Sequence, residues 1–261
     1  MKVAFITFSD EGVRVGALLG ERMPGMDCFV HEGAGAAPFT HERFASVREL
    51  VGRLFKEYEG LIFCGPSGVA VRAVATHLEH KSRDPAVVVV DVCGRYAVSL
   101  LGGHEAGANR LAVEAANALG AEPVITTSTE ARKRCVVGIG CRRGTSKEAV
   151  VKAVRSALEA ASVRLEEVRL LATADLKRDE EGLIEAAQEL GLPLRFIASS
   201  EIKAEAARFA ASAFVEEKTG LPAVAEPAAV LAGRRTTLIL PRTKFPGVTV
   251  AIARENCSWS E

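Results

Sequence analysis

The stretch Pro85-Ala-Val-Val-Val-Val-Asp91-Val-Cys-Gly94-Arg-Tyr96-Ala-Val-Ser-Leu-Leu101-Gly-Gly-His104 decides how this chain folds. The β-branched run from Pro85 to Asp91 is typical of a central strand that is buried on both faces. Tyr96 to Leu101 is a second short apolar run. The connection between the two runs is too short for a crossover helix, so we expect an antiparallel hairpin there. Gly102 and Gly103 then turn the chain.

Outward from this stretch, short apolar runs alternate with segments of helical periodicity. In the first half, strands are expected over Val3–Phe8, Cys28–Val30, Leu61–Cys64 and Pro123–Thr127. Helices are expected after a cap at Ser9, from Phe44 to Phe55, from Val69 to Leu78 and through Leu111 to Gly120, with a loop over Gly33–Thr40. This alternation predicts a mostly parallel sheet with flanking helices and some antiparallel strands.

The same pattern restarts after a polar, charged segment between Thr126 and Cys135. Strands are expected over Val136–Gly140, Leu170–Ala172, Pro193–Ile197, Leu238–Leu240 and Val248–Ile252, the last two as a hairpin across Pro241–Gly247. Helices are expected after Ser146 and over Glu181–Leu190 and Ala204–Thr219. We therefore predict an α/β protein of two α/β domains, residues 1–130 and 131–261.

The composition indicates a globular protein with a hydrophobic core. Lys+Arg and Asp+Glu both number 33, so the net charge of +0 gives no argument for nucleic acid or an anionic membrane as a partner. The sequence has no apolar run that could span a bilayer. The residues after Met1 do not have the pattern of a signal sequence, and we expect none. The six cysteines form no Cys-x-x-Cys pair. We expect a cytoplasmic protein with reduced thiols.

The segment from Ser99 to Asn109 joins a strand end, two glycines and a histidine at an expected helix start. A helix start presents N–H groups and partial positive charge that stabilise an anion or a developing oxyanion. Histidine exchanges a proton readily near neutral pH, so His104 is a candidate general base. His104 and Glu105 could equally do no more than begin the helix. Ligands of parallel sheets bind beyond the carboxyl ends of strands, where we expect both this turn and Gly65–Gly68.

The second half offers weaker candidates. The loop Gly138-Ile-Gly-Cys-Arg-Arg-Gly144-Thr-Ser146 matches neither common nucleotide-binding pattern, but arginines beside backbone N–H groups suit a carboxylate. Glu226 precedes Pro227, so we expect it just before the following helix, where it is either a helix cap or a second acid or base. Cys141 has no histidine nearby in sequence, which disfavours a nucleophile.

Four further cations are spread over both halves of the chain. Each by itself is expected to be a surface charge, but together they would suit a ligand with many carboxylates: Arg72, Arg110, Lys177 and Lys203.

Motifs in both halves form an ordered set. In the first half they are Gly68-Val-Ala-Val-Arg72, Lys81 with Asp84–Asp91, Ser99-Leu-Leu-Gly-Gly-His104 with Gly107-Ala-Asn109, and Pro123-Val-Ile-Thr-Thr127. In the second half they are Val137-Gly-Ile-Gly-Cys-Arg142 with Gly144-Thr145, Pro222–Glu226 with Ala228-Ala229, and Lys244-Phe with Val248–Arg254. This set closely resembles the cobalt-precorrin-5A hydrolase family over most of the chain. Longer members carry a middle region that this chain lacks between Thr127 and Cys135.

The resemblance implies an enzyme of the anaerobic, early-cobalt branch of cobalamin biosynthesis. Such an enzyme opens the δ-lactone formed by the ring A acetate and releases the C20 carbon with its methyl group as acetaldehyde, giving cobalt-precorrin-5B. The substrate is a flat cobalt macrocycle rimmed with acetates and propionates. Cobalt arrives with this substrate, so we expect no metal or other cofactor held by the protein. A homodimer or contacts with other pathway enzymes would be compatible with this role.

The resemblance also suggests roles for individual residues. His104 is the leading base and Glu105 the alternative, and the N–H groups after Gly102 and Gly103 would form an oxyanion site. Glu226 would be a second acid or base. Arg72 and Arg142 would hold substrate carboxylates. The other positions expected to bind substrate are Gly68, Ser99, Asn109, Thr126, Thr127, Gly140, Cys141 and Gly144.

Two other classes of function stay open at this stage. A non-catalytic corrinoid-binding or carrier protein would bind the macrocycle tightly but release no acetaldehyde. A nucleotide-dependent transferase built on the loop after Gly138 would be protected by ATP or a dinucleotide during thermal melting.

Overall fold

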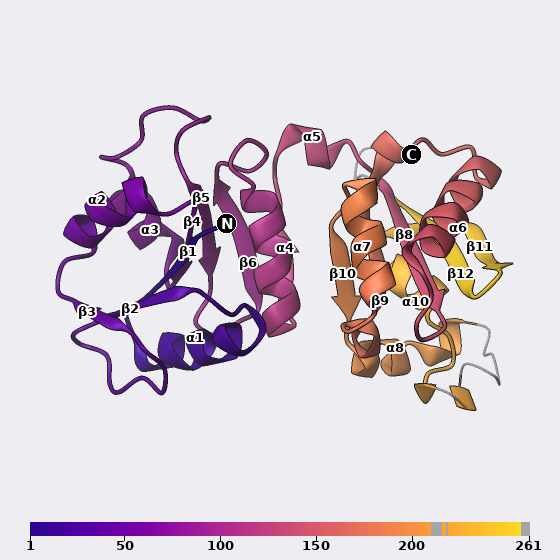
Figure 1. Ribbon diagram of the computed structural model, residues 1–261, viewed down its shortest axis with the longest axis horizontal. Coiled ribbons are helices and arrows are strands. Elements are labelled where there is room, and N and C mark those ends of the chain that lie inside the picture. Colours follow the sequence, from indigo (N-terminus) through magenta and orange to yellow (C-terminus); the bar gives the residue numbers. More distant parts are fainter. Residues whose placement is uncertain (210–215, 218, 257–261) are drawn as a thin grey trace. The chain divides into compact units, whose positions relative to one another are not determined.

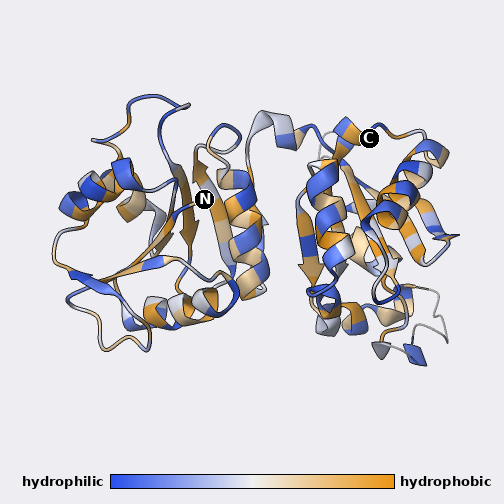
Figure 2. Ribbon diagram, in the orientation of Figure 1, coloured by the Kyte–Doolittle hydropathy of each residue, from blue (hydrophilic) through white to orange (hydrophobic). Residues whose placement is uncertain are grey.

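The computed structural model describes residues 1–209, 216–217 and 219–256, and the chain divides into two compact units, Met1–Thr127 and Ser128–Glu261 (Figure 1). Each unit has its own sheet and its own hydrophobic core. Strands are rich in apolar residues, whereas polar residues recur along the helices (Figure 2). This is the pattern expected of helices that cover a buried sheet.

Sheet A, in the first unit, has the strand order β3-β2-β1-β4-β5-β6-β7. Its strands are Val3–Thr7 (β1), Asp27–His31 (β2), Glu42–Phe44 (β3), Gly60–Cys64 (β4), Ala86–Val90 (β5), Tyr96–Leu101 (β6) and Glu122–Val124 (β7). Strands β1 to β5 pair in parallel, β6 pairs antiparallel with β5, and β7 is parallel to β6. The predicted mostly parallel sheet and its antiparallel hairpin are confirmed.

Helices cover both faces of sheet A. They are Asp10–Arg22 (α1), Val47–Glu57 (α2), Ser67–Val74 (α3) and Ala108–Leu119 (α4). Apolar residues of α1 and α4 pack on one face, and those of α2 and α3 pack on the other. Ser9 caps α1 as predicted, since its hydroxyl accepts from the Gly12 N–H at 3.3 Å.

Three elements of this unit have wrong predicted boundaries. The helix expected over Val69–Leu78 is α3, which begins earlier, at Ser67, and already ends at Val74. Phe44 ends the short edge strand β3 and is buried in the core, so it is not part of a helix. Helix α2 begins at Val47 because Ser46 caps it, with its hydroxyl accepting from the Glu49 N–H. The predicted strand over Pro123–Thr127 is shorter, since β7 ends at Val124.

The antiparallel direction of β6 decides where its glycine turn lies. Leu101, at the end of β6, pairs with Val87 near the start of β5. Gly102 therefore lies at the edge where β1 to β5 begin, whereas Gly65 follows β4 at the edge where they end. A five-residue strand spans about 16 Å. The expectation that both glycine turns share one ligand-binding edge is wrong for Gly102.

Sheet B, in the second unit, has the order β10-β9-β8-β12-β11. Its strands are Cys135–Cys141 (β8), Val168–Ala174 (β9), Leu194–Ile197 (β10), Thr236–Phe245 (β11) and Val248–Glu255 (β12). Strands β8, β9 and β10 are parallel, and β12 pairs antiparallel with both β8 and β11. The mixed sheet and the predicted terminal hairpin are confirmed.

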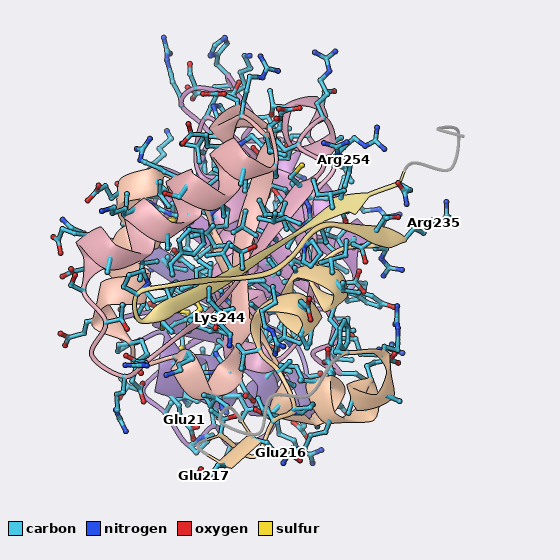
Figure 3. The ribbon with its side chains drawn as sticks, turned by 90° about the vertical axis from the view of Figure 1, so that its right-hand side faces the viewer. Glu21, Glu216, Glu217, Arg235, Lys244 and Arg254 are labelled. Atoms are coloured by element: carbon cyan, nitrogen blue, oxygen red, sulfur yellow. The ribbon has the colours of Figure 1, made fainter. Side chains whose placement is uncertain are left out.

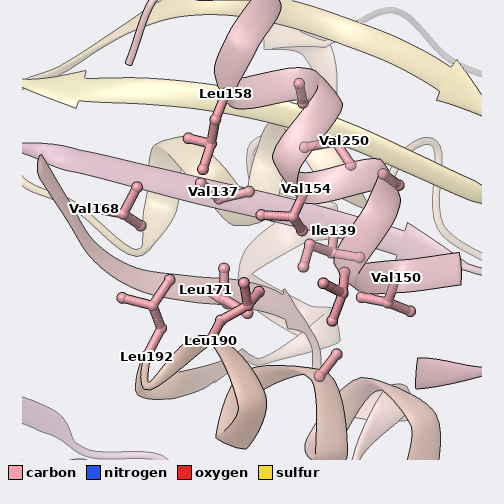
Figure 4. Packing of buried hydrophobic residues seen from close by; sticks show 14 of the residues in the cluster. Val137, Ile139, Val150, Val154, Leu158, Val168, Leu171, Leu190, Leu192 and Val250 are labelled. Carbon is pink, nitrogen blue, oxygen red and sulfur yellow. The ribbon is translucent and has the colours of Figure 1, made fainter. Parts of the chain in front are cut away.

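Helices also cover both faces of sheet B. Lys147–Ala160 (α6) and Glu181–Leu190 (α7) pack on one face, where Val154 and Leu190 meet Val137, Ile139 and Leu171 (Figure 4). Ser199–Ala204 (α8) and Ala225–Leu231 (α10) pack on the other face.

Close packing of α10 on β8 depends on a glycine. A Cβ at Gly138 would lie 1.9 Å from the Ala225 carbonyl oxygen and 2.6 Å from the Ala229 nitrogen. Only glycine allows the helix to come this near the strand. The start of α10 is therefore held at the carboxyl-terminal half of β8.

The predicted start of the helix over Ala204–Thr219 is wrong. Ala204 is the last residue of α8, and a short 3₁₀ turn follows at Ala206–Arg208. Residues 210–215 and 218 of that prediction lie outside the described residues, as does Cys257. Over the residues that are described, none of the helices is both long and apolar enough to cross a membrane.

Candidate functional site

The turn from Gly102 to Gly107 connects β6 to α4. Gly102 and Gly107 have φ values of +69° and +84°, which favour glycine. The Gly102 carbonyl accepts from the N–H groups of Ala106 and Ala108, each at 3.1 Å, and the Gly103 carbonyl accepts from Asn109 at 3.0 Å. These bonds close the turn against the first turn of α4.

Gly103 has no room for a side chain. A Cβ there would lie 2.5 Å from the Thr127 methyl carbon and 2.9 Å from Oδ1 of Asn109. The backbone of the turn is thus held in direct contact with both side chains, and any larger residue would displace it.

Beneath this turn runs a chain of polar side chains. The Ser99 hydroxyl donates to Oδ1 of Asn109 at 2.8 Å, and Nδ2 of Asn109 donates to the Thr127 hydroxyl at 3.0 Å. Asn109 is buried. The structure therefore brings Ser99, Gly103, Asn109 and Thr127 together, with the amide of Asn109 tied to the protein itself. Thr126, which directly precedes Thr127 in the chain, is exposed.

His104 is exposed at the outside of the turn. It does not begin a helix as predicted, because the positive φ of Gly107 separates the turn from α4, which starts at Ala108. Among the described residues, the N–H groups of Gly103 and His104 donate to no acceptor. An exposed imidazole thus stands beside two available backbone donors.

Glu105, the alternative base, is an exposed residue in an ion pair. Its Oε1 lies 2.9 Å from Nζ of Lys81. The hydrogen bond from Lys81 holds the pKa of Glu105 below its ordinary value. A carboxylate with a lowered pKa accepts a proton less readily, so this contact weakens Glu105 as a base.

Gly68 and Arg72 lie elsewhere. Both belong to α3, which starts at the opposite edge of sheet A from Gly102. Nη1 of Arg72 donates to the Gly68 carbonyl at 3.2 Å, so the exposed guanidinium folds back along its own helix. The structure does not bring this pair to the His104 turn.

In the second unit, the loop after β8 is also organised by hydrogen bonds. Gly144 has a φ of +71°, and its N–H donates to Oε2 of Glu180 at 3.0 Å. The Thr145 hydroxyl donates to the Arg142 carbonyl at 2.7 Å, and the Arg142 N–H donates to the Gly247 carbonyl at 3.0 Å. The loop is thus fixed between α7 and the β11–β12 hairpin.

The partner of Glu180 is Lys177, which sequence reasoning interpreted as a surface charge. That interpretation is wrong, since both residues are only 8% exposed and Nζ of Lys177 lies 2.9 Å from Oε1 of Glu180. Burial acts to raise the pKa of Glu180, but the hydrogen bonds from Lys177 and Gly144 outweigh it and lower that pKa. No periodicity or motif in the sequence marks this pair.

Cys141 lies within the field of this ion pair. Burial raises the pKa of its thiol, while the charge of Lys177 lowers it and that of Glu180 raises it. The net effect is an upward shift, which keeps the thiol protonated near neutral pH. This agrees with the expectation that Cys141 is not a nucleophile.

Glu226 is buried in the first turn of α10, not before the helix as predicted. Its Oε1 accepts from the backbone N–H of Arg242 at 2.9 Å. The start of α10 also contacts the strand end that precedes the loop, since a Cβ at Gly140 would lie 3.8 Å from the Ala225 nitrogen. Glu226 and Gly140 therefore lie at the same end of β8.

The other cations are exposed. Arg110 forms an ion pair with Glu114 on the surface of α4, and Lys203 is an exposed residue of α8. Figure 3 shows Lys244 at one end of the β11–β12 hairpin and Arg235 with Arg254 at the other. In the part of the chain that the structure describes, no three His, Cys, Asp or Glu side chains gather as metal ligands would.

Comparison with known proteins identifies the family. Residues 49–130 match the model described as "Cobalamin synthesis G N-terminal", and residues 135–253 match "Cobalamin synthesis G C-terminus". The chain belongs to the cobalamin synthesis G family. The resemblance noted in the sequence is confirmed. The first match ends at residue 130, inside the charged segment between Thr126 and Cys135, and the second begins at Cys135.

Three curated relatives differ in how much of this chain they match and in how similar they are to it. Cobalt-precorrin-5A hydrolase of Priestia megaterium is 27% identical over 306 aligned positions, covering 80% of this chain and 82% of the relative. The Salmonella typhimurium protein of the same name is 39% identical over 131 residues, covering 49% of this chain and 36% of the relative. Protein CobE of a Sinorhizobium species is 36% identical over 128 residues, covering 48% and 83%. The 306 positions exceed the 261 residues of this chain, so the first relative carries segments that this chain lacks.

Proposed function

We propose that this chain is a cobalt-precorrin-5A hydrolase that opens the ring A acetate δ-lactone and releases the C20 carbon as acetaldehyde, giving cobalt-precorrin-5B. The names of two relatives and the match to both family models support this proposal. The observation that carries it is the turn at His104, where an exposed imidazole stands beside two backbone N–H groups that have no acceptor among the described residues.

The lactone requires a base and an oxyanion site. In this proposal His104 takes a proton from a water molecule, and that water attacks the acyl carbon. The N–H groups of Gly103 and His104 stabilise the tetrahedral oxyanion. The acyl–oxygen bond breaks, leaving the ring A acetate and a hydroxyl on C20. The bond from C20 to the macrocycle then breaks. The C20 hydroxyl loses its proton as the carbonyl of acetaldehyde forms, and the ring carbon keeps the bonding electron pair and takes up a proton.

The remaining residues have supporting roles in the proposal. Asn109, with Ser99 and Thr127, positions the turn from below. Glu105 holds Lys81, a cation next to the turn that could face a substrate carboxylate. Arg72 lies at the other edge of sheet A and would act away from the lactone. Arg142 and Glu226 belong to the second unit, as a carboxylate binder and a second acid or base.

Cobalt enters and leaves with the corrinoid in this proposal, and the protein itself holds no metal. Elemental analysis of purified, substrate-free protein tests this directly. We expect substoichiometric metal, and stoichiometric cobalt or zinc would contradict the proposal.

The central experiment is an anaerobic incubation of the purified protein with enzymatically prepared cobalt-precorrin-5A. We expect acetaldehyde together with a corrinoid whose mass has fallen by the two-carbon fragment and risen by one water. Tight binding with no acetaldehyde would instead support the alternative of a corrinoid carrier, or a chain that needs a partner to supply the region found in longer relatives.

A further inference from the structure

The ion pair of Lys177 and Glu180 occupies a place where α/β sheets bind ligands. Lys177 ends a 3₁₀ turn, Asp175–Lys177, that directly follows the parallel strand β9. Glu180 bonds to Gly144 in the loop that follows the neighbouring parallel strand β8. The pair therefore lies beyond the carboxyl ends of two adjacent parallel strands, the edge at which such sheets bind small molecules.

The ammonium of Lys177 has unused hydrogen-bonding capacity. An ammonium carries three N–H donors. Within residues 1–209, 216–217 and 219–256, Nζ of Lys177 makes one hydrogen bond, to Glu180, although its side chain is only 10% exposed. Burying a charged group with donors unpaired is costly, so this arrangement favours a further acceptor.

The local charge favours an anion as that acceptor. The charge of Arg143 also acts to lower the pKa of Glu180, so a second cation acts on this carboxylate. A ligand carboxylate beside Lys177 would interact favourably with both cations. The thiol of Cys141, which is itself within the field of both charges, offers only a weak acceptor.

We propose that Lys177 is a carboxylate-binding residue, whose ammonium takes an acetate or propionate of the corrinoid while Glu180, fixed by Gly144, holds it in place. The identity of the ligand rests on the proposed function. Lys177 and Glu180 belong to the second unit, whereas the His104 turn belongs to the first.

In this arrangement Glu180 positions the ammonium of Lys177 but also competes with the ligand carboxylate for it. The Glu180 carboxylate neutralises the positive charge that would bind the ligand. Replacing it with glutamine keeps an amide oxygen that can accept from the Gly144 N–H, and releases the full charge of Lys177. Glu180→Gln should therefore strengthen binding of a carboxylate ligand, which a purely structural ion pair would not do.

The test compares two corrinoid probes, cobyrinic acid, which has free side-chain carboxylates, and its fully methylated ester. Binding of each is followed by absorbance titration with the intact protein. We expect Lys177→Met to lose about 10-fold or more of the preference for the acid over the ester. Glu180→Gln should bind the acid several-fold more tightly and the ester unchanged. Lys147→Met is the matched control, because Lys147 is also ion-paired, to Glu189, but on the surface of α6.

The variants also distinguish the role of Lys177 from the binding of a corrinoid, on which the identity of the ligand rests. Lys177→Met alone leaves Glu180 buried without its partner, so the double variant with Glu180→Gln is measured beside it, with folding followed by thermal melting. A wild-type preference for the acid that survives intact in the double variant would overturn the role of Lys177 and leave corrinoid binding standing. A wild-type protein that binds neither probe would overturn the corrinoid ligand and this site with it.

Discussion

Two glycine-containing loops of this molecule are held in place by different chemistry. The Gly102–Gly107 turn lies on a neutral chain of hydroxyl and amide groups, in which buried Asn109 bonds to both Ser99 and Thr127. The loop after β8 is held by a buried ion pair, in which Glu180 bonds to both Gly144 and Lys177. Neutral support does not change with pH, whereas charged support does. In the two proposals above, fixed geometry serves the first loop and recognition of charge serves the second.

The largest expected effect tests whether the first loop is the catalytic one. His104→Ala should reduce acetaldehyde release by about 10²- to 10⁴-fold, the usual contribution of a general base. Stability should not change, because His104 is exposed. His41→Ala, a histidine of the loop between β2 and β3, is the matched control and should keep its activity. A His104→Ala variant that retains most of its turnover would remove the catalytic role from this turn.

A methyl group placed in each loop should sharpen the contrast. Gly103→Ala should destabilise the protein by about 2–3 kcal/mol, because the new Cβ meets Thr127 and Asn109. Gly144→Ala meets no atom within 4 Å, and should cost about 1 kcal/mol from its positive φ. Urea unfolding measures both. Gly20→Ala, in open space on α1, serves as the control, and equal costs for Gly103 and Gly144 would contradict the tight packing of the first loop.

The neutral support can be weakened without changing its shape. Thr127→Val keeps the side-chain volume but leaves Nδ2 of Asn109 without its acceptor, so we expect a loss of about 1 kcal/mol together with a lower kcat. Thr126→Val, an exposed neighbour, should be neutral. Unchanged stability and kcat in Thr127→Val would mean that the polar chain does not support the turn.

The smallest expected effect distinguishes charged from neutral support. The pKa of Glu180 is lowered in the folded protein, so its stabilising contribution is complete above its ordinary value of 4.5 and is lost as pH falls through the lower folded value. The stability difference between wild type and Glu180→Gln should therefore shrink below about pH 4.5. The difference for Thr127→Val should stay constant over the same range. Glu166→Gln, on the surface, controls for the change in charge.

Much of this architecture could be predicted because strand runs and turn glycines are local signals. The β-branched run before Asp91 and the short link to Tyr96 gave both the central strand and its antiparallel neighbour. Phe44 was misplaced because it continues the helical spacing of α2, although a cap at Ser46 starts the helix later. The position of Gly102 at the opposite edge follows from pairing direction, which a glycine motif by itself does not contain.

The site was less predictable than the fold. The glycines, the histidine and Asn109 form a compact motif, but the mutual bonding of Ser99, Asn109 and Thr127 arises from strands and a helix brought together in space. Lysine is normally exposed, so nothing in the sequence around Lys177 indicated a buried partner. Helix α7 follows this pair and packs against the loop after β8, where a Cβ at Gly182 would lie 2.1 Å from the Thr145 carbonyl oxygen.

The most direct test of the central claim is turnover of cobalt-precorrin-5A in water enriched in oxygen-18. If water activated at His104 attacks the acyl carbon, the ring A acetate of the corrinoid product gains one heavy oxygen, detectable by its mass. Acetaldehyde exchanges its oxygen with water, so the corrinoid carries the informative label. We expect one heavy oxygen in the corrinoid for each acetaldehyde released. Acetaldehyde with an unlabelled corrinoid would contradict acyl attack and the oxyanion site at Gly103.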